Sequence, residues 1–243
     1  PQMEQRTIAF IGSGNMAEAI ISGLIASGYP SEKVTAADPT PERLTVLAGR
    51  FGVNTTTDNL AAAAKADVVV LSVKPQLMAE VCQPMQSIDW SNKLVISIAA
   101  GVSCERIERL LGATLRLIRV MPNTPALVLK GASGLFATTT VSEAERQLAD
   151  QIFSSVGIVE WVEEENMMHA VTALSGSGPA YFFLIMEAME EAAVKAGIPA
   201  GSARKLAIQT ILGAAEMATQ SDSVVQNRKL PNRSFLYLTL HIS

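Results

Sequence analysis

Hydrophobic residues along the first 160 positions follow two alternating arrangements. Short, continuously apolar runs are typical of parallel strands that are buried on both faces. Longer stretches between them carry apolar residues at helical spacing. We expect strands at 8–11, 33–38, 51–56 (short, or at a sheet edge), 67–73, 94–98, 115–120 and 156–161. Strands that alternate with helices in this way predict an α/β fold with a doubly wound parallel sheet.

Capping residues indicate where the helices of this first part begin and end. Side-chain oxygens of Ser, Thr, Asp and Asn favour helix starts, and glycine just past the last turn favours helix ends. The predicted helices are Asn15 to Ser27 (closed by Gly28), one after Thr40 and Pro41 that reaches Arg50, one capped by Asp58, one from Ser103 to about Leu111, and one opened by the capping box Ser142–Glu145.

The pattern changes near position 163. From Glu163 onward only helical periodicity remains, with a turn at Gly197 and Pro199 and a final helix over 202–219. We therefore expect a nucleotide-binding domain over 1–162 and an all-α domain over 163–220. Helices this apolar need a partner surface, which an intertwined dimer would supply. Residues 221–243 carry no helical stripe and are expected to form an atypical, poorly packed tail.

A glycine-rich turn follows the first predicted strand. Gly12 permits a tight turn, Gly14 lets the backbone approach a pyrophosphate, and Ala17 keeps the following helix close to the sheet. The helix start then directs unpaired N–H groups at the phosphates. This strand–turn–helix predicts a Rossmann-like dinucleotide site, with a purely structural turn as the alternative.

Composition and charge narrow the classes of partner. Of the 243 residues, 49% are hydrophobic and 17% charged, which excludes disorder over most of the length, and the net charge of −4 gives no reason to expect nucleic acid. Cys82 and Cys104 lack metal-like spacing and predict a reducing compartment. No basic leader and no apolar run of about 20 residues is present, so we expect a cytoplasmic protein without a membrane partner or a metal.

Polar residues at predicted strand and helix ends are candidates for chemistry. Lys74 follows a buried strand at the edge where α/β folds bind ligands, although a solvated lysine is the alternative. Asn123 and Thr124 lie between two prolines and can orient a nicotinamide or an imine, or serve only the turn. The segment Ser175–Pro179 opens a helix whose free N–H groups can bind a carboxylate, unless its glycines serve a close helix crossing.

Two further questions concern acid–base groups and the cofactor. His169 begins an apolar helical stretch and His241 lies in the tail, so we expect neither to be catalytic. Asp38 ends the second strand, where an acid usually bonds the ribose 2′-OH and favours NAD. Thr40 and Arg43 follow at the next helix start and can hold a 2′-phosphate. The sequence is therefore compatible with either NADPH or NADH as the cofactor, and we favour NADPH.

Several motifs in order resemble the pyrroline-5-carboxylate reductases, which make proline. The resemblance runs over about 7–219, and its most specific stretch is Ala170-Val-Thr-Ala-Leu-Ser-Gly-Ser-Gly-Pro-Ala-Tyr181. It also rests on Ile11-Gly-Ser-Gly-Asn-Met-Ala17, Val73-Lys-Pro75, Ile98-Ala-Ala-Gly101, Arg119-Val-Met-Pro-Asn-Thr-Pro125 and Leu212-Gly-Ala-Ala215.

The resemblance implies an NAD(P)H-dependent reductase of 1-pyrroline-5-carboxylate, acting in proline biosynthesis as a homodimer or a higher homo-oligomer. It implies catalytic positions at Asn123, Thr124 and Ser177, in a pocket that a partner chain closes. It implies cofactor contacts at Gly12, Ser13, Gly14, Asn15, Met16, Ala17, Asp38, Asn59, Val73, Lys74, Pro75, Ala99, Ala100 and Gly101.

The chain departs from the family at its C-terminal end, and two alternative functions are open. Family members continue past the last helix into a Thr-Ser-Pro-Gly-Gly-Thr-Thr segment that holds the substrate, whereas this chain changes character at Gln220. We therefore expect an incomplete, apparently truncated helical domain, and a chain that binds nucleotide with impaired catalysis is one alternative. A reductase of the β-hydroxyacid dehydrogenase type is the other, although Lys195 lies too far along the chain to be its acid.

Overall fold

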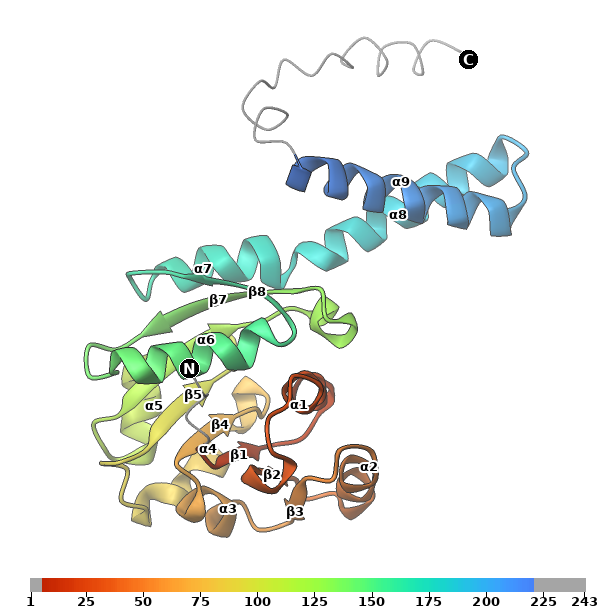
Figure 1. The fold of residues 1–243 in the computed structure, drawn as a ribbon. Helices are drawn as coiled ribbons and strands as arrows, with labels where there is room; N and C mark the ends of the chain where they lie inside the picture. The colour runs from red at the N-terminus through yellow and green to blue at the C-terminus, as the bar shows by residue number, and fades with distance from the viewer. Residues whose placement is uncertain (1–5, 221–243) are drawn as a thin grey trace. The chain divides into compact units, whose positions relative to one another are not determined.

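The computed structural model describes residues 6–220, and its first part is built on one eight-stranded sheet (Figure 1). The strand order is β3-β2-β1-β4-β5-β6-β7-β8. The strands are β1 (Ile8–Ile11), β2 (Val34–Ala37), β3 (Asn54–Thr56), β4 (Val68–Leu71), β5 (Leu94–Ser97), β6 (Arg116–Met121), β7 (Gly131–Ala137) and β8 (Gly157–Trp161). Neighbouring strands from β3 to β6 are parallel, β7 is antiparallel to β6, and β8 is parallel to β7. The strand order reverses beside β1, which is the switch point at which doubly wound sheets bind ligands.

Helices cover both faces of this sheet. They are α1 (Asn15–Ala26), α2 (Pro41–Phe51), α3 (Asn59–Lys65), α4 (Met78–Cys82), α5 (Cys104–Leu111) and α6 (Glu143–Ser154). Ile8 and Phe10 of β1 face one core with α1, α2 and α6, and Ala9 and Ile11 face a second core with α3, α4 and α5. Burial on both faces explains why these strands are continuously apolar.

The predicted doubly wound fold and most predicted helix starts are confirmed. The Asp58 carboxylate accepts the N–H of Ala61 at 3.0 Å, the Ser103 hydroxyl accepts the N–H of Arg106 at 3.1 Å, and the capping box at Ser142 is formed. The helix α2 also begins as predicted, with Thr40 at the N-cap position and Pro41 in the first turn, although the Thr40 side chain makes no capping hydrogen bond.

One strand of the sheet was not predicted, and the predicted short strand at the sheet edge covers fewer residues than expected. Residues 131–137 form β7, which we did not predict because two glycines interrupt the pattern of apolar residues there. Packing requires one of these glycines, since a Cβ at Gly134 would lie 2.4 Å from Val171. The predicted strand 51–56 is β3 only from Asn54, because Phe51 still belongs to α2 and Gly52 ends that helix with a φ of +69°.

The helical part begins with α7 (Met167–Val171), continues through a π-helical turn over Thr172–Gly176, and contains α8 (Gly178–Lys195) and α9 (Ala200–Gln220). Contacts divide the chain into two compact units after Pro179. The turn at Gly197, with a φ of +98°, joins α8 to α9 as predicted. The boundary at 162 stays a prediction, and the predicted tail with His241 lies outside the described residues.

Candidate functional site

A cavity of about 470 Å³ lies at the carboxyl ends of β1, β2 and β4. This is the edge of a parallel sheet at which nucleotides bind. The cavity is lined by Gly12, Ser13, Gly14, Asp38, Pro39, Asn59, Leu60, Ser72, Val73, Lys74, Leu77, Glu80, Val81, Pro84 and Met85. Seven of the fourteen predicted cofactor positions therefore line one cavity: Gly12, Ser13, Gly14, Asp38, Asn59, Val73 and Lys74.

The glycine-rich turn has the geometry of a phosphate cradle. Gly12 has a φ of +92°, and a Cβ there would lie 2.7 Å from Val73 Cγ1 and 2.8 Å from the Ser72 carbonyl oxygen. The Gly12 N–H donates to the Ala37 carbonyl at 2.9 Å, which ties the turn to β2. A Cβ at Gly14 would meet no atom within 4 Å, so its backbone borders open space. The first glycine is required by the turn, and the second leaves room for a ligand.

Asp38 and Arg43 both hold this turn from the side of β2. One Asp38 carboxylate oxygen accepts the Ser13 N–H at 3.0 Å, and the other accepts the Thr40 N–H at 2.9 Å. Arg43 Nε donates to the Ser13 carbonyl at 2.7 Å, and its guanidinium is paired with Glu18. The residues predicted to choose the cofactor thus support the loop, although each carboxylate oxygen can accept a second hydrogen bond.

Asn59 provides a polar group with spare hydrogen-bonding capacity. Its Oδ1 is buried and has no hydrogen-bond partner among the described residues. Since Asn59 lines the cavity at the first position of α3, the oxygen can accept from a ligand hydroxyl or amide. The cavity therefore fits a dinucleotide: it has an open glycine backbone for phosphates and an unused acceptor for a sugar.

The remaining predicted cofactor residues do not line the cavity. Asn15, Met16 and Ala17 form the first turn of α1; Ala17 is buried and Met16 packs against the core. Pro75 begins a short 3₁₀ turn, and Ala99, Ala100 and Gly101 follow β5. Parallel pairing of β4 and β5 puts this last group on the same sheet edge. Their contacts with cofactor stay a prediction.

The predicted catalytic residues lie at the end of β6 and around the π-helical turn. Asn123 Nδ2 donates to the Ser175 carbonyl at 3.0 Å, and Asn123 Oδ1 accepts the Ala132 N–H at 2.8 Å. The Ser177 N–H, expected to be free, donates to the Thr172 carbonyl at 2.8 Å. Thr124 is exposed. The structure thus joins Asn123 to the Ser175–Pro179 segment, which the sequence could only suggest.

Arg119 and Glu165 form an ion pair that was not predicted from the sequence, and it holds the segment just before α7. Glu165 Oε1 lies 2.8 Å from Arg119 Nη1 and accepts the Cys104 N–H at 2.7 Å. Burial acts to raise the pKa of Glu165, but the hydrogen bonds from Cys104 and Arg119 lower it below its usual value overall. The pKa of the Cys104 thiol is raised to about 12, mainly because the thiol is buried and also because the Glu165 carboxylate lies beside it. The Glu165 carboxylate therefore ties the start of α5 to β6, and the Cys104 thiol, whose pKa is raised, offers no thiolate nucleophile.

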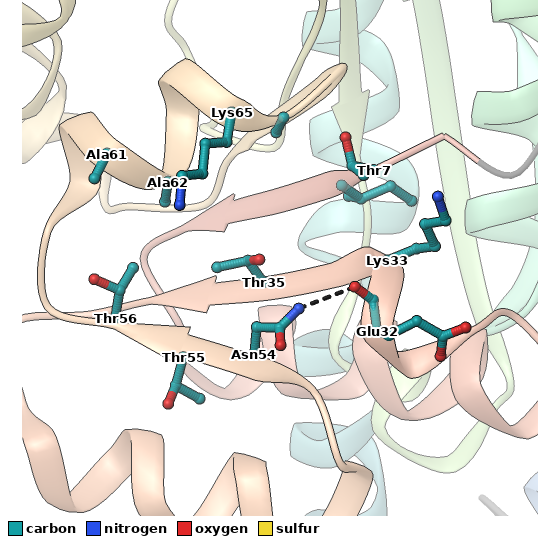
Figure 2. Close-up of a pocket in the computed structure, with 12 residues that line it drawn as sticks. Thr7, Glu32, Lys33, Thr35, Asn54, Thr55, Thr56, Ala61, Ala62 and Lys65 are labelled. Carbon is teal, nitrogen blue, oxygen red and sulfur yellow. Dashed lines mark hydrogen bonds between the residues drawn. The ribbon is translucent and has the colours of Figure 1, made fainter.

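A second hollow, of about 480 Å³, lies at the amino ends of β1, β2 and β3 (Figure 2). Thr7 and Lys33 immediately precede β1 and β2, Asn54 begins β3, and Lys65 ends α3. Asn54 Nδ2 donates to the Glu32 carbonyl at 3.0 Å. The small side chains of α3 leave this space open. This hollow shares no lining residue with the cavity at the carboxyl ends of the strands, so the two are separate.

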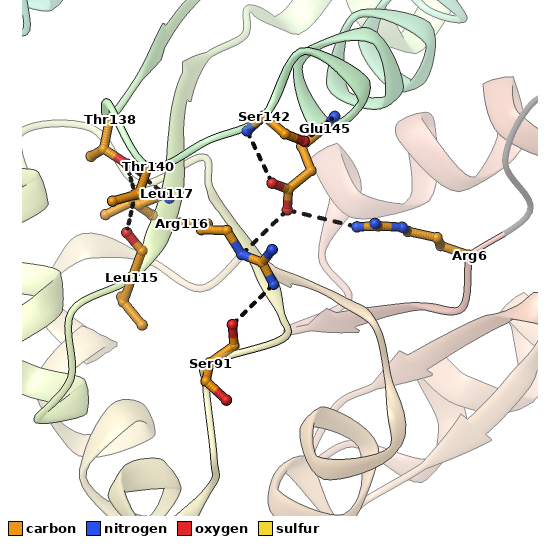
Figure 3. Close-up of polar contacts among 9 residues, drawn as sticks. All are labelled: Arg6, Ser91, Leu115, Arg116, Leu117, Thr138, Thr140, Ser142 and Glu145. Atoms are coloured by element: carbon orange, nitrogen blue, oxygen red, sulfur yellow. Dashed lines mark hydrogen bonds and ion pairs between the residues drawn. The ribbon is translucent and has the colours of Figure 1, made fainter.

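Glu145 is the most deeply buried acid among the described residues, and its neighbours are structural (Figure 3). Its Oε1 accepts the Ser142 N–H at 3.0 Å, and its Oε2 lies 3.6 Å from both Arg6 Nη1 and Arg116 Nε. The carboxylate therefore fastens the start of α6 to β6 and to the segment before β1, and it takes no part in the cavity.

The second unit exposes many large apolar side chains. On α8 they are Tyr181, Phe182, Phe183, Leu184, Ile185, Met189 and Val194, and on α9 they are Leu206, Ile208, Leu212 and Met217. Such a surface is typical of a protein–protein interface. Within residues 6–220, no helix is long and apolar enough to cross a membrane, and no three His, Cys, Asp or Glu side chains are grouped as metal ligands.

Comparisons with known proteins match both parts of the chain. Residues 7–101 match the family described as NADP oxidoreductase, coenzyme F420-dependent, and residues 165–230 match pyrroline-5-carboxylate reductase dimerisation. The pyrroline-5-carboxylate reductase of Vibrio alginolyticus is 52% identical over 219 residues, which are 90% of this chain and 80% of that protein.

Two solved structures are similar over nearly the whole chain. The pyrroline-5-carboxylate reductase of Coxiella burnetii has a TM-score of 0.89 and 43% identity, covering 97% of this chain and 91% of its own. The pyrroline carboxylate reductase of Plasmodium falciparum, solved with NADP bound, has a TM-score of 0.81 and 28% identity, covering 98% and 94%.

Proposed function

Since the chain belongs to the pyrroline-5-carboxylate reductase family, we infer that it reduces 1-pyrroline-5-carboxylate to L-proline, the last step of proline biosynthesis. The observation that carries this function is the 52% identity to a reductase over nine-tenths of the chain, since it spans the nucleotide half and the helical half together. The hydride donor is NADPH, in keeping with the NADP bound to the Plasmodium falciparum relative and with the NADP family matched by 7–101.

The substrate limits what the protein must supply. The imine nitrogen can arrive protonated, and hydride addition to the neighbouring ring carbon breaks the C=N π bond. The electron pair moves to nitrogen, which gives a neutral amine without a protein acid. NADPH, when bound, supplies that hydride. The chain has to orient the imine carbon, hold the carboxylate and exclude water, which agrees with the exposed position of His169 on α7.

We propose that all fourteen residues predicted from the sequence contact the cofactor, each group at a different part of it. The N–H groups around Gly14 and the start of α1 face phosphate, and the unused Asn59 oxygen accepts from a ribose. Lys74 supplies positive charge at the exposed mouth of the cavity. Ala99 to Gly101 continue the same edge toward β6, where the nicotinamide has to meet the imine.

For the substrate we propose the end of β6 and the segment Ser175–Pro179. Within residues 6–220 the Thr124 and Ser177 hydroxyls have no hydrogen-bond partner, and both residues are close in sequence to the contact between Asn123 and Ser175. Small polar groups at this place can orient a carboxylate and a ring nitrogen. The site is completed by a second chain, for which the exposed faces of α8 and α9 are the proposed contact.

The protein forms a homo-oligomer, as its dimerisation segment indicates, and we propose a dimer as the basic assembly. A cytoplasmic location remains a proposal from the sequence. The direct test is consumption of NADPH with 1-pyrroline-5-carboxylate and formation of L-proline. Binding of NADPH without turnover would instead favour the alternative of a nucleotide-binding chain with impaired catalysis.

A further inference from the structure

The amide of Asn123 joins three segments that are distant in sequence. Asn123 follows β6, its Oδ1 accepts the N–H of Ala132 in β7 at 2.8 Å, and its Nδ2 donates to the carbonyl of Ser175 at 3.0 Å. The amide orientation is fixed by its partners, because a backbone N–H can only donate and a backbone carbonyl can only accept. A rotated amide would lose both hydrogen bonds.

The carbonyl of Ser175 needs such a donor because of a proline. In an α-helix, this carbonyl would accept from the residue four positions later, which is Pro179 and has no N–H. The chain here is a π-helical turn, in which the Ser177 N–H reaches back to the Thr172 carbonyl at 2.8 Å. Asn123 therefore supplies a hydrogen bond that the helix itself lacks at this position.

Close packing supports the same turn from β6 and β7. A Cβ at Gly176 would lie 2.7 Å from Met121 Cε, and a Cβ at Gly134 would lie 2.4 Å from Val171. The turn therefore lies against the end of β6, and the end of α7 just before the turn packs against the middle of β7. A single-turn π-helix is an uncommon conformation that often marks a functional site, and it persists only where its surroundings hold it.

We propose that Asn123 is a positioning residue, which holds the Ser175–Ser177 turn against the end of β6 and so sets the place of Thr124 and Ser177 relative to each other. This proposal rests on the substrate site proposed above. It changes the role expected for Asn123, because both polar ends of its amide are engaged with the backbone rather than available to the imine.

The proposal is tested with Asn123→Asp, compared with the parent across pH. A carboxylate at this position still accepts from Ala132 but cannot donate to Ser175, whereas the protonated acid can donate. We expect kcat/KM for 1-pyrroline-5-carboxylate to fall by about 10-fold to 100-fold at neutral pH. Relative to the parent, it should recover as the pH is lowered below the pKa of the introduced acid. The dissociation constant for NADPH should stay within about threefold of the parent value.

Asn54→Asp is the matched control. Asn54 also donates from its side chain to a backbone carbonyl at 3.0 Å, but at the opposite edge of the sheet. It should show neither the loss nor the recovery. A purely structural defect at residue 123 would lower activity without recovery at low pH, and parent-like kcat/KM in Asn123→Asp would also overturn the proposal.

Amide hydrogen exchange gives a readout that does not depend on the reaction. In Asn123→Ala, the amides of Ala132 and Ser177 should exchange faster than in the parent, while those of β1 should not change. Unchanged exchange at both amides overturns the proposal. If the parent itself lacks reductase activity, the proposed function fails, and the exchange pattern still decides whether Asn123 holds the turn.

Discussion

One carboxylate oxygen of Asp38 accepts a 3.0 Å hydrogen bond from the backbone N–H of Ser13, in the middle of the glycine-rich turn. The acid at the end of β2 therefore helps to shape the glycine-rich turn. A negative charge at this position should disfavour the 2′-phosphate of NADPH, although the same carboxylate supports the loop.

Asp38→Asn should raise the preference for NADPH. The amide oxygen can still accept one of the two backbone N–H groups, while the charge that repels a 2′-phosphate is removed. We expect the ratio of kcat/KM for NADPH to that for NADH to rise about tenfold. Asp67→Asn is the control, because Asp67 accepts the Thr7 N–H at 3.1 Å at the amino ends of the strands. A ratio that is unchanged by Asp38→Asn would show that this carboxylate does not face the phosphate.

Gly12→Ala should abolish cofactor binding, since its φ is +92° and the new methyl group would lie within 3 Å of Val73 and Ser72. We expect a loss of about 2–4 kcal/mol of unfolding free energy and no measurable NADPH binding. Gly28→Ala isolates the backbone effect, because Gly28 has a similar φ of +94° with no atom within 4 Å of the new Cβ. It should cost about 1–2 kcal/mol and leave NADPH binding intact. Equal effects of the two variants on binding would contradict this account of the turn.

Glu165→Gln should weaken the fold at neutral pH and change its response to acid. The pKa of Glu165 is lowered in the folded protein, so its stabilisation is complete above the ordinary carboxylate pKa and is lost as the pH falls through the folded value. Urea unfolding should therefore separate the parent from the variant by about 1–3 kcal/mol at pH 7 and by less at about pH 4.

Glu105→Gln is the control for this acid effect, because Glu105 pairs with Arg109 on the exposed surface of α5. Its unfolding free energy should stay close to the parent value at both pH values. A constant difference between Glu165→Gln and the parent across this range would mean that the Glu165 charge is not coupled to folding.

Leu184→Glu should weaken self-association. Leu184 is 67% exposed in the isolated chain, among the apolar side chains of α8. A charge buried in an oligomer contact at this position would be left unpaired, so the dissociation constant should rise at least about tenfold. Val46→Glu, on α2 with 47% exposure, is the matched control. The measurement is molar mass by light scattering over a dilution series; an unchanged mass in Leu184→Glu would place the contact elsewhere.

Local signals explain which parts of the fold could be predicted. The glycine turn at Gly12, the caps at Asp58 and Ser103, and the capping box at Ser142 are each written within a few residues, and the structure contains all of them. The strand β7 was not predicted from the sequence, because its Gly134 is required by close packing against Val171, a residue distant in sequence. Local pattern cannot register that kind of packing requirement.

In the candidate site, too, the residues next to short motifs could be predicted, whereas contacts between residues distant in sequence could not. Seven predicted cofactor residues line one cavity because they follow strands whose parallel order the sequence indicates. The engagement of Asn123 with Ser175, and of Arg119 with Glu165, joins residues about fifty positions apart. Both contacts depend on where α7 and the π-helical turn pack on the sheet, which no short motif specifies.

We propose that this chain binds NADPH in the cavity beside β1 and reduces the imine near the end of β6, at a site that a second chain completes. The most direct measurement follows NADPH absorbance with purified protein and 1-pyrroline-5-carboxylate, with L-proline quantified in the same reaction and Gly12→Ala as the inactive reference. We expect one L-proline to form for each NADPH consumed by the parent, and none to form with Gly12→Ala. Saturable NADPH binding by the parent with no L-proline above that reference would contradict it.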